Sequence, residues 1–225
     1  MKVRLLALGS TLVMILSSSA SRASAAPASC EQTASYPTPP ASVDPGAEDT
    51  AYIRVITARA GKIVAALDLP DSATFYKVRD IVAGQYYALN AVYTGRDNEL
   101  KQLKNQSDKK LADSLKQKIQ QDVDEKIARL HTAYLGKLAT VIRPGQIDQV
   151  KDGMTYSVLE VTFHAYLQLW PQLTDEQKGV IFEDLLEARE HAMDAGSSEK
   201  KHWWFGKYKG RINNYLSSQG LEKKK

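Results

Sequence analysis

The stretch from residue 111 to residue 138 reads LADSLKQKIQQDVDEKIARLHTAYLGKL, and its apolar side chains recur at steps of four and three. The recurring positions are Leu111, Leu115, Ile119, Val123, Ile127, Leu130, Tyr134 and Leu138. This spacing places all of them on one side of an α-helix. Over about 30 residues, at 1.5 Å per residue, it predicts an amphipathic helix roughly 45 Å long.

Helical spacing continues on both sides of this stretch, from Asp49 to about residue 220, and no alternation typical of a strand is sustained. A first helix is expected to end at Pro70, and Asp71 or Ser72 can cap a second. The second helix is also long and ends at the polar break 105–108. A short turn between two long amphipathic helices predicts an antiparallel hairpin.

Shorter helices are expected after the hairpin, and they cover residues 145–152, 155–170, 174–195 and 198–217. The stretch 155–162 is ambiguous because Tyr156, Val158 and Val161 favour a strand. A single strand would have no partner, so we expect a helix there. Residues 174–177, TDEQ, form a capping box that begins the next helix. The sequence therefore predicts an all-α, single-domain helical bundle over residues 49–220.

The N-terminus has the features of a secretory signal peptide. Lys2 and Arg4 precede an apolar run that ends at Leu16, and Ala23-Ser24-Ala25 forms an A-x-A cleavage site. The run is about 12 residues long, shorter than the roughly 20 that span a bilayer, so no membrane span is expected. We predict cleavage near Ala25, a flexible Pro-rich leader over 26–48, and a periplasmic or secreted protein.

Charge and cysteine content narrow the classes of partner. The chain carries 30 Lys and Arg against 26 Asp and Glu. Three of those bases lie in residues 1–25, which contain no acid, so the mature chain is almost balanced and no nucleic-acid partner is expected. Residues 221–225 are expected to be a solvated basic tail. Cys30 is the single cysteine, which excludes a disulfide scaffold and a multi-thiolate metal site.

The most unusual segment is residues 201–216, KHWWFGKYKGRINNYL. At 100° per residue its apolar residues fall on one side, which predicts a buried face. The opposite side carries Trp203, Gly206, Lys207, Gly210, Asn213 and Asn214. Glycine inside a helix costs about 1 kcal/mol relative to alanine, and a purely solvated face gains nothing from that cost.

These residues have the chemistry that a carbohydrate requires. An indole stacks on the apolar face of a sugar ring, and Asn amides offer paired donors and acceptors to hydroxyl groups. Lys207 or Arg211 can hold a uronic carboxylate. We expect a carbohydrate ligand, with acidic polysaccharides among the candidates, bound by Trp203, Lys207, Arg211, Asn213 and Asn214. The alternative is that another helix packs on the two glycines and that Trp203 belongs to the core.

No catalytic motif is present: the sequence has no Ser/His/Asp order, phosphate-binding loop or dinucleotide fingerprint, and we expect no cofactor. A second group of polar residues consists of Glu183, Glu187, Glu190, His191 and Asp194, in which Glu187 and His191 are four residues apart. We expect a solvated acidic face there, which explains the group more simply than a metal site. Asp80, Asp97 and Glu160 suit glycoside hydrolysis only if the fold brings two of them to the required separation. A polysaccharide hydrolase or lyase is therefore the second interpretation.

Three blocks of sequence carry a resemblance to a known family. The blocks are YKVRD at 76–80 with QYYALN at 85–90, VKDGMTY at 150–156, and AREHAMDAGSS at 188–198 running into KYKGRINNYL at 207–216. Together they resemble domain of unknown function family 3826, a family of exported bacterial proteins, over about residues 50–220. The resemblance implies a sugar-binding role and supplies no catalytic residues.

Residues 173–177, LTDEQ, are similar to the L-T-x-x-Q motif of small helical periplasmic chaperones. Helix caps of this kind also occur in unrelated proteins. Those chaperones lack a final helix rich in Trp and Gly. A chaperone-like protein is therefore the third interpretation.

Overall fold

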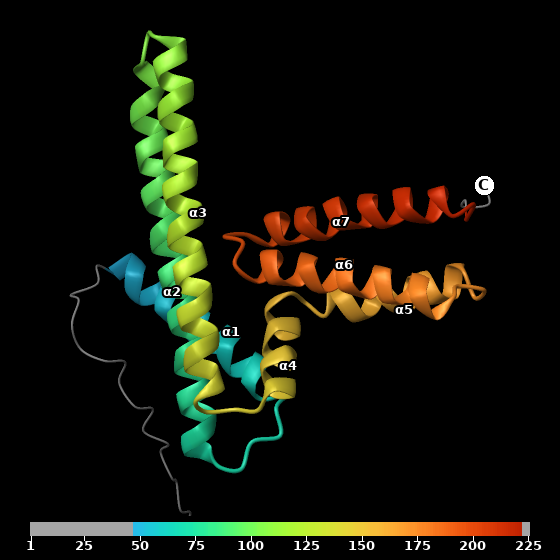
Figure 1. Ribbon diagram of the computed structural model, residues 1–225. Coiled ribbons are helices and arrows are strands. Elements are labelled where there is room, and N and C mark those ends of the chain that lie inside the picture. The colour runs from blue at the N-terminus through green and yellow to red at the C-terminus, as the bar shows by residue number, and fades with distance from the viewer. Residues whose placement is uncertain (1–46, 222–225) are drawn as a thin grey trace, which may run out of the picture. The chain divides into compact units, whose positions relative to one another are not determined.

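The computed structural model describes residues 47–221, and this part of the chain is all-helical, as predicted (Figure 1). Its elements are α1 (Ala47–Val64), α2 (Ser72–Gln102), the 3-10 turn η1 (Leu103–Asn105), α3 (Lys109–Ala139), α4 (Pro144–Met154), α5 (Val158–Leu169), α6 (Asp175–Met193) and α7 (Ser198–Ser218). The predicted signal peptide, Cys30, almost all of the leader and residues 222–225 lie outside the described residues. Among the described helices, none has the length and apolar composition needed to cross a bilayer.

The two long helices α2 and α3 pack side by side and are joined by η1 (Figure 1). Asp71 caps α2, and its Oδ1 accepts a hydrogen bond from Thr74 N at 2.7 Å. Asp108 caps α3 in the same way, accepting from Leu111 N at 3.1 Å. Each carboxylate satisfies an amide that the first turn of a helix leaves without a partner, so the caps determine where both helices begin.

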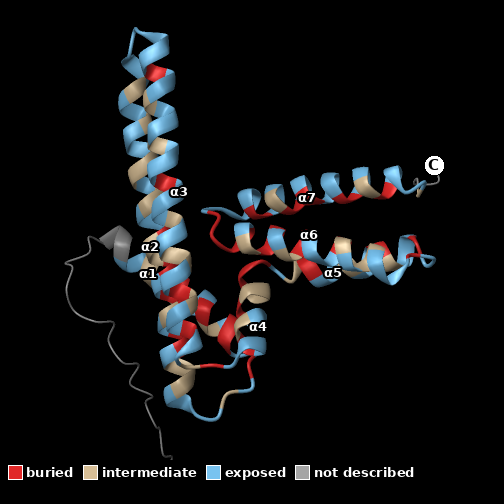
Figure 2. Ribbon diagram, in the orientation of Figure 1, coloured by how far each residue is buried: buried red, intermediate tan, exposed pale blue. Residues whose placement is uncertain are grey.

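A first core lies where α1 and α4 pack on the part of the α2–α3 pair that is far from η1 (Figure 1). Its most buried members are Ile56, Ala60, Val64, Val78, Val82, Leu138, Val150 and Met154. Towards the η1 end, most of the surface of α2 and α3 is exposed (Figure 2). Leu111 is 46% exposed, and Leu115 and Ile119 are only half-buried. The long apolar stripe of α3 therefore belongs to a core only in its second half.

The end of α1 differs from the sequence prediction. The helix ends at Val64, six residues before Pro70. Leu67 is still buried although it lies outside the helix. Gln146 of α4 explains the early end, because its Nε2 donates to the carbonyl of Asp68 at 2.6 Å and so holds this loop against α4.

A second core is formed by α5, α6 and α7 (Figure 2). Its most buried members are Ile181, Leu185, Ala188, Ala192, Phe205, Tyr208, Ile212 and Leu216. The capping box at the start of α6 is present: Thr174 Oγ1 accepts from Gln177 N at 3.2 Å, and Gln177 Oε1 accepts from Thr174 N at 3.0 Å. The buried stripe of α7 is the one that helical spacing predicted.

The chain enters α5 through a left-handed turn. Tyr156 and Ser157 have φ angles of 61° and 53°, which cost roughly 1–2 kcal/mol each for residues with a Cβ. The Tyr156 ring stacks on His202 of α7, with centroids 6.0 Å apart. The ambiguous stretch 155–162 is therefore a tight turn followed by helix, and its strand-favouring residues form no strand.

Gly196, in the turn between α6 and α7, lies very close to α2. A Cβ at this position would lie 2.5 Å from Cδ2 of Tyr93 on α2. The ring cannot easily move, because the Tyr93 hydroxyl donates to the carbonyl of Asp194 at 2.9 Å. We therefore expect Gly196→Ala to lower the free energy of unfolding in urea by about 1–3 kcal/mol.

The matched control is Gly84→Ala, which adds the same methyl group to an exposed position of α2 with nothing within 4 Å. It should raise stability by up to about 1 kcal/mol, since alanine favours a helix more than glycine. Equal effects of the two substitutions would contradict the close approach at Gly196.

Candidate functional site

Opposite its buried stripe, α7 presents an exposed surface that we call the Trp203 face: Trp203, Gly206, Lys207, Gly210 and Asn214. The Trp203 side chain is 53% exposed. A Cβ added at Gly206 or Gly210 would have nothing within 4 Å. Within the described residues, no helix packs on the two glycines, and the alternative that places Trp203 in the core is wrong.

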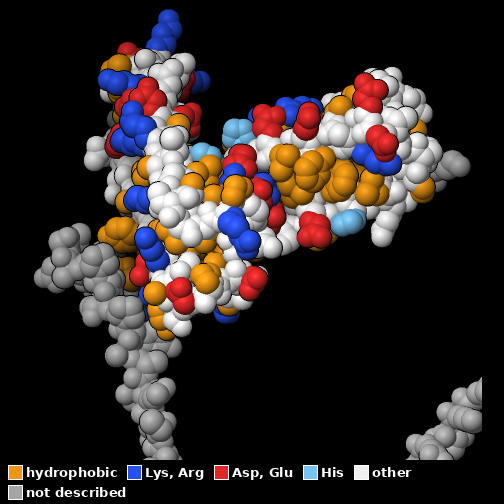
Figure 3. Space-filling view, turned by 60° about the horizontal axis from the view of Figure 1, so that its bottom comes forward, with side chains coloured by type: hydrophobic (Ala, Val, Ile, Leu, Met, Phe, Trp, Pro, Cys, Tyr) orange, Lys and Arg blue, Asp and Glu red, His pale blue; other side chains and the backbone are white. Residues whose placement is uncertain are grey.

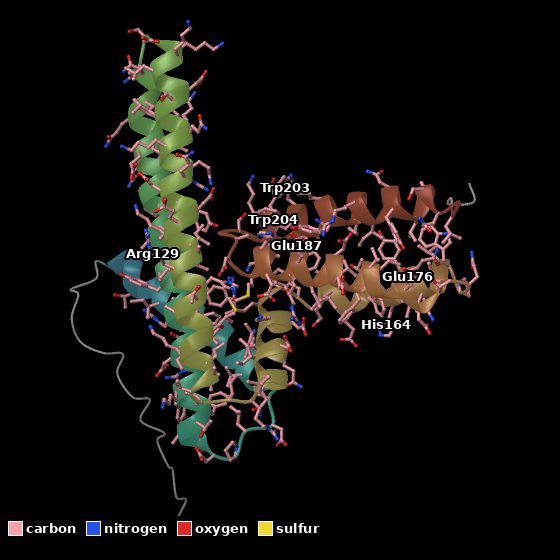
Figure 4. All side chains as sticks on the ribbon, in the orientation of Figure 1. Arg129, His164, Glu176, Glu187, Trp203 and Trp204 are labelled. Atoms are coloured by element: carbon pink, nitrogen blue, oxygen red, sulfur yellow. The ribbon has the colours of Figure 1, made fainter. Side chains whose placement is uncertain are left out.

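Trp203 stands at the outer end of a series of aromatic rings. Its indole meets Trp204 edge to face, with centroids 5.0 Å apart at 74°. Trp204 stacks on His191 of α6 at 4.3 Å and 14°, and His191 lies 6.0 Å from the buried ring of Tyr208. Figure 4 shows both indoles near the start of α7, close to Glu187 on α6. The packed rings restrict the orientations of the exposed indole.

Two lysines lie beside this indole. The Nζ atom of Lys200 is 5.6 Å from the Trp203 ring centroid. The Nζ atom of Lys207 is 5.9 Å from the same centroid and 4.9 Å from that of Trp204. These distances suit cation–π contacts. Within residues 47–221, neither ammonium has a carboxylate oxygen within 4.0 Å, so both charges remain available to a ligand.

Arg211, a predicted ligand residue, is already paired. Its Nε donates to Asp184 Oδ1 at 2.9 Å, its Nη2 also contacts Asp184, and Nη2 donates to Glu187 Oε2 at 2.5 Å. The guanidinium also lies over Tyr208, 4.5 Å from the ring centroid. The hydrogen bonds to Asp184 and Glu187 raise the pKa of Arg211. The residue therefore joins α6 to α7, and its charge is already balanced by two carboxylates.

Asn213 lies on the opposite flank of α7 from Arg211. The two positions are about 160° apart at 100° per residue. The amide oxygen of Asn213 accepts a hydrogen bond from the hydroxyl of Tyr166 on α5 at 3.0 Å. Of the five predicted ligand residues, the structure brings Trp203, Lys207 and Asn214 onto one face, and it places Asn213 and Arg211 at its two borders.

The carboxylates near this face do not suit hydrolysis. Hydrogen bonds from Tyr208 and Arg211 lower the pKa of Glu187, whereas a general acid needs a raised pKa. Burial, together with the same contact with Glu187, raises the pKa of Tyr208 to about 12. Within the described residues, no cluster of three His, Cys, Asp or Glu side chains could hold a metal ion. Glu187 therefore lacks the raised pKa of a general acid.

Asp80 and Asp97 are not brought together as a catalytic pair. Asp80 and Asp97 are both on α2, and their separation of 17 residues corresponds to about 25 Å along the axis. Paired glycosidase carboxyls lie within roughly 10 Å of each other. Glu160 is on α5, which packs on α6.

Sequence reasoning missed a second polar cluster, which we call the junction network: Gln85, His131, Lys151, Glu190 and Asp194. Asp194 is only 6% exposed, and its Oδ2 lies 2.6 Å from His131 Nδ1. Its Oδ1 accepts from Gln85 Nε2 at 3.2 Å. Lys151 Nζ donates to both oxygens of Glu190, at 2.9 and 2.8 Å. These side chains connect α2, α3, α4 and the end of α6, so the expected solvated acidic face is wrong for Glu190 and Asp194.

Lys201 is buried beside this network. Its Nζ donates to the carbonyls of Ala192 at 3.2 Å and Met193 at 3.1 Å, at the end of α6. Burial lowers the pKa of Lys201 to about 8. Helical spacing contained a signal for this burial, because Lys201 falls on the same side of α7 as Phe205 and Tyr208. No comparable signal links His131 to Asp194, which lie 63 residues apart.

The junction network predicts a pH-dependent stability. The hydrogen bond to Asp194, and the nearby charge of Glu190, raise the pKa of His131 above its usual value. The folded chain then binds more protons at His131 than the unfolded chain, so this contribution is complete below about pH 6.5 and is lost as the pH rises through the raised pKa. We expect His131→Asn to flatten the fall in unfolding free energy between about pH 6 and pH 8, measured in urea.

His164→Asn is the control, since His164 is exposed on α5, where its Nε2 lies 3.8 Å from Glu160 Oε1 (Figure 4). That variant should retain the pH dependence of the unaltered protein. A slope that His131→Asn leaves unchanged would show that the network does not titrate through His131.

Comparison with known proteins identifies a family but no characterised relative. The chain matches the family described as Protein of unknown function (DUF3826) over residues 53–225, and it therefore belongs to that family. No curated protein matches the chain.

Proposed function

We propose that this is an exported protein that binds carbohydrate on the Trp203 face. The observation that supports the proposal most is the 53% exposed indole of Trp203, supported from beneath by a series of stacked rings. An indole held in this way offers a flat apolar surface to a sugar ring with little loss of side-chain entropy on binding. Export is proposed from the features of residues 1–25 alone.

The polar groups near the indole agree with such a ligand. Asn214 lies about 20° from Trp203 around α7, so its amide is on the same face. An amide offers both donors and an acceptor to hydroxyl groups, and each lysine offers three donors. Together these side chains can bind the polar edge of a sugar whose apolar face covers Trp203.

The two glycines also agree with a ligand on this surface. Each costs about 1 kcal/mol relative to alanine in a helix interior, and neither has a close neighbour that would require the absence of a side chain. Without Cβ atoms, positions 206 and 210 form a low, flat stretch of helix between Trp203 and Asn214. A bound chain can approach the backbone there.

A second candidate function is binding of other proteins, as in a chaperone. It is favoured by exposed apolar side chains on α5 and α6, where Val161 is 66%, Leu169 57% and Phe182 39% exposed. Figure 3 shows hydrophobic side chains gathered on this part of the surface. Suppression of client aggregation that is indifferent to added sugars and to substitution of Trp203 would favour this function.

The central prediction concerns Trp203→Ala. Because the side chain is mostly solvated, its loss should change the melting temperature little, while removal of the stacking surface should weaken glycan affinity about tenfold or more. Glycans are first identified by thermal shift against a plant and host glycan panel, and affinity is then measured by calorimetry. The proposal expects binding without new reducing ends or unsaturated products.

Trp203→Phe and Phe182→Ala are the controls for this experiment. Trp203→Phe should retain part of the affinity, because a smaller aromatic ring remains. Phe182→Ala removes an exposed ring from α6, outside the Trp203 face, and should leave the affinity unchanged. Unfolding of Trp203→Ala, or unchanged affinity, would contradict the proposed site.

The glycines give a prediction in which stability and binding change in opposite directions. Gly206→Ala and Gly210→Ala should each stabilise the fold by up to about 1 kcal/mol, since the added methyl group has open space and alanine favours a helix. The same methyl group should lower glycan affinity, because it projects from the helix and prevents the glycan from approaching the backbone. Urea unfolding and calorimetry measure the two effects, and stabilisation with full affinity would exclude the glycine backbone from the site.

A further inference from the structure

We infer that the ligand of the Trp203 face is an anionic glycan chain that lies along the axis of α7. This inference rests on the proposed carbohydrate-binding function and specifies the class of glycan. It depends on three features: the ionic state of the neighbouring side chains, the length of the face, and the position of the two lysines relative to the indole.

The cationic side chains around the indole differ in whether they are neutralised. Arg211 is paired with both Asp184 and Glu187, so that border of α7 carries no excess positive charge. Within residues 47–221, the ammonium groups of Lys200 and Lys207 lie over aromatic rings and have no carboxylate oxygen within 4.0 Å. Glu199 is exposed four residues before Trp203, in the first turn of α7, where the positive end of the helix dipole stabilises its carboxylate. The indole is therefore flanked by two unneutralised ammonium groups.

The length of the face indicates a chain and not a single sugar. Trp203 and Asn214 are 11 residues apart, which corresponds to about 16 Å along the helix axis. Their angular positions differ by about 20°, so a line between them runs nearly parallel to the axis and passes over Gly210. One sugar ring cannot contact both ends. Several linked residues are needed for contacts with the indole and the amide at the same time.

The lysines determine where an acidic group would lie. Lys200 is three residues before Trp203 and Lys207 is four residues after it, so the two ammonium groups lie about one turn away on either side of the indole. A carboxylate or sulfate on the sugar that stacks on Trp203 can then accept a charge-assisted hydrogen bond from one of them. Carboxylate and sulfate share this chemistry, and the experiment distinguishes them.

The test measures calorimetric affinity of the full mature chain for four probes. The probes are an oligogalacturonate hexasaccharide, its methyl ester, a chondroitin sulfate hexasaccharide and galacturonic acid monosaccharide. We expect at least one anionic hexasaccharide to bind. If the carboxylate form is the ligand, the methyl ester should bind about tenfold more weakly than the free acid. The monosaccharide should bind more weakly than either hexasaccharide. Affinity should fall as the salt concentration rises.

The variants Lys207→Gln and Lys209→Gln remove the same charge from neighbouring positions of α7. Lys207 is on the Trp203 face, whereas Lys209 is on the α5 side, where its carbonyl lies 3.4 Å from the Tyr166 hydroxyl. Lys207→Gln should weaken binding of the anionic hexasaccharide about tenfold, and Lys209→Gln should change it less than twofold. Equal losses in the two variants would overturn the assignment of the anion to Lys207.

The outcomes separate this inference from the proposed function. If the methyl ester binds as tightly as the acidic hexasaccharides and Trp203→Ala abolishes that binding, the carbohydrate site stands and the anionic class is wrong. If the monosaccharide binds as tightly as the hexasaccharides, the extended ligand is wrong. If none of the four probes binds but the plant and host glycan panel yields a ligand whose binding Trp203→Ala removes, the anionic class is wrong and the carbohydrate site stands. If the panel also yields no ligand, both the inference and the proposed function are overturned.

Discussion

The placement of α7 depends on the buried carboxylate of Asp194, the residue that caps the C-terminal end of α6. This carboxylate is bonded to His131 on α3 and to Gln85 on α2, and the carbonyl of the same residue accepts from Tyr93. Removing one partner of a buried ionic contact typically costs about 3–5 kcal/mol, because the remaining charge is left unpaired in a poorly solvated position. The turn from α6 to α7 is thus attached to α2 and α3 at a point where few alternative conformations are available.

The start of α7 follows directly from that attachment. Gly196 allows the turn to approach the Tyr93 ring, Ser197 caps the helix by accepting from Lys200 N, and Lys201 donates to the last carbonyls of α6. Trp203 comes two residues later, on the first turns of the helix. The direction of its indole is then set by Trp204 and, through His191, by α6. An exposed side chain can therefore have a defined orientation because the end of α6 beneath it is fixed by buried polar contacts.

Helical spacing predicted the elements and the two sides of α7 well, because both follow from the 3.6-residue period alone. It separated Phe205, Tyr208 and Ile212 from Trp203 and Asn214, and the structure has the same division. The helical period does not predict which residues of other helices contact the positions at the borders of the Trp203 face. Arg211 faces two acids of α6 and Asn213 faces a tyrosine of α5, and these contacts depend on how helices distant in sequence pack. The left-handed turn at residues 156–157 also could not be predicted from the sequence, since neither residue is a glycine.

The two sides of α7 differ in a way that stability alone does not explain. The inner side is closely packed, and even its one lysine has two carbonyl partners. The outer side carries two glycines that weaken the helix and an indole that leaves apolar area in water. Alanine at the two glycines would be compatible with the fold, because a Cβ there would have nothing within 4 Å, and a short polar residue would fit at the half-exposed position 203. Features that lower stability and have no packing role are typical of binding surfaces, so the composition of the outer side supports a ligand independently of which ligand it is.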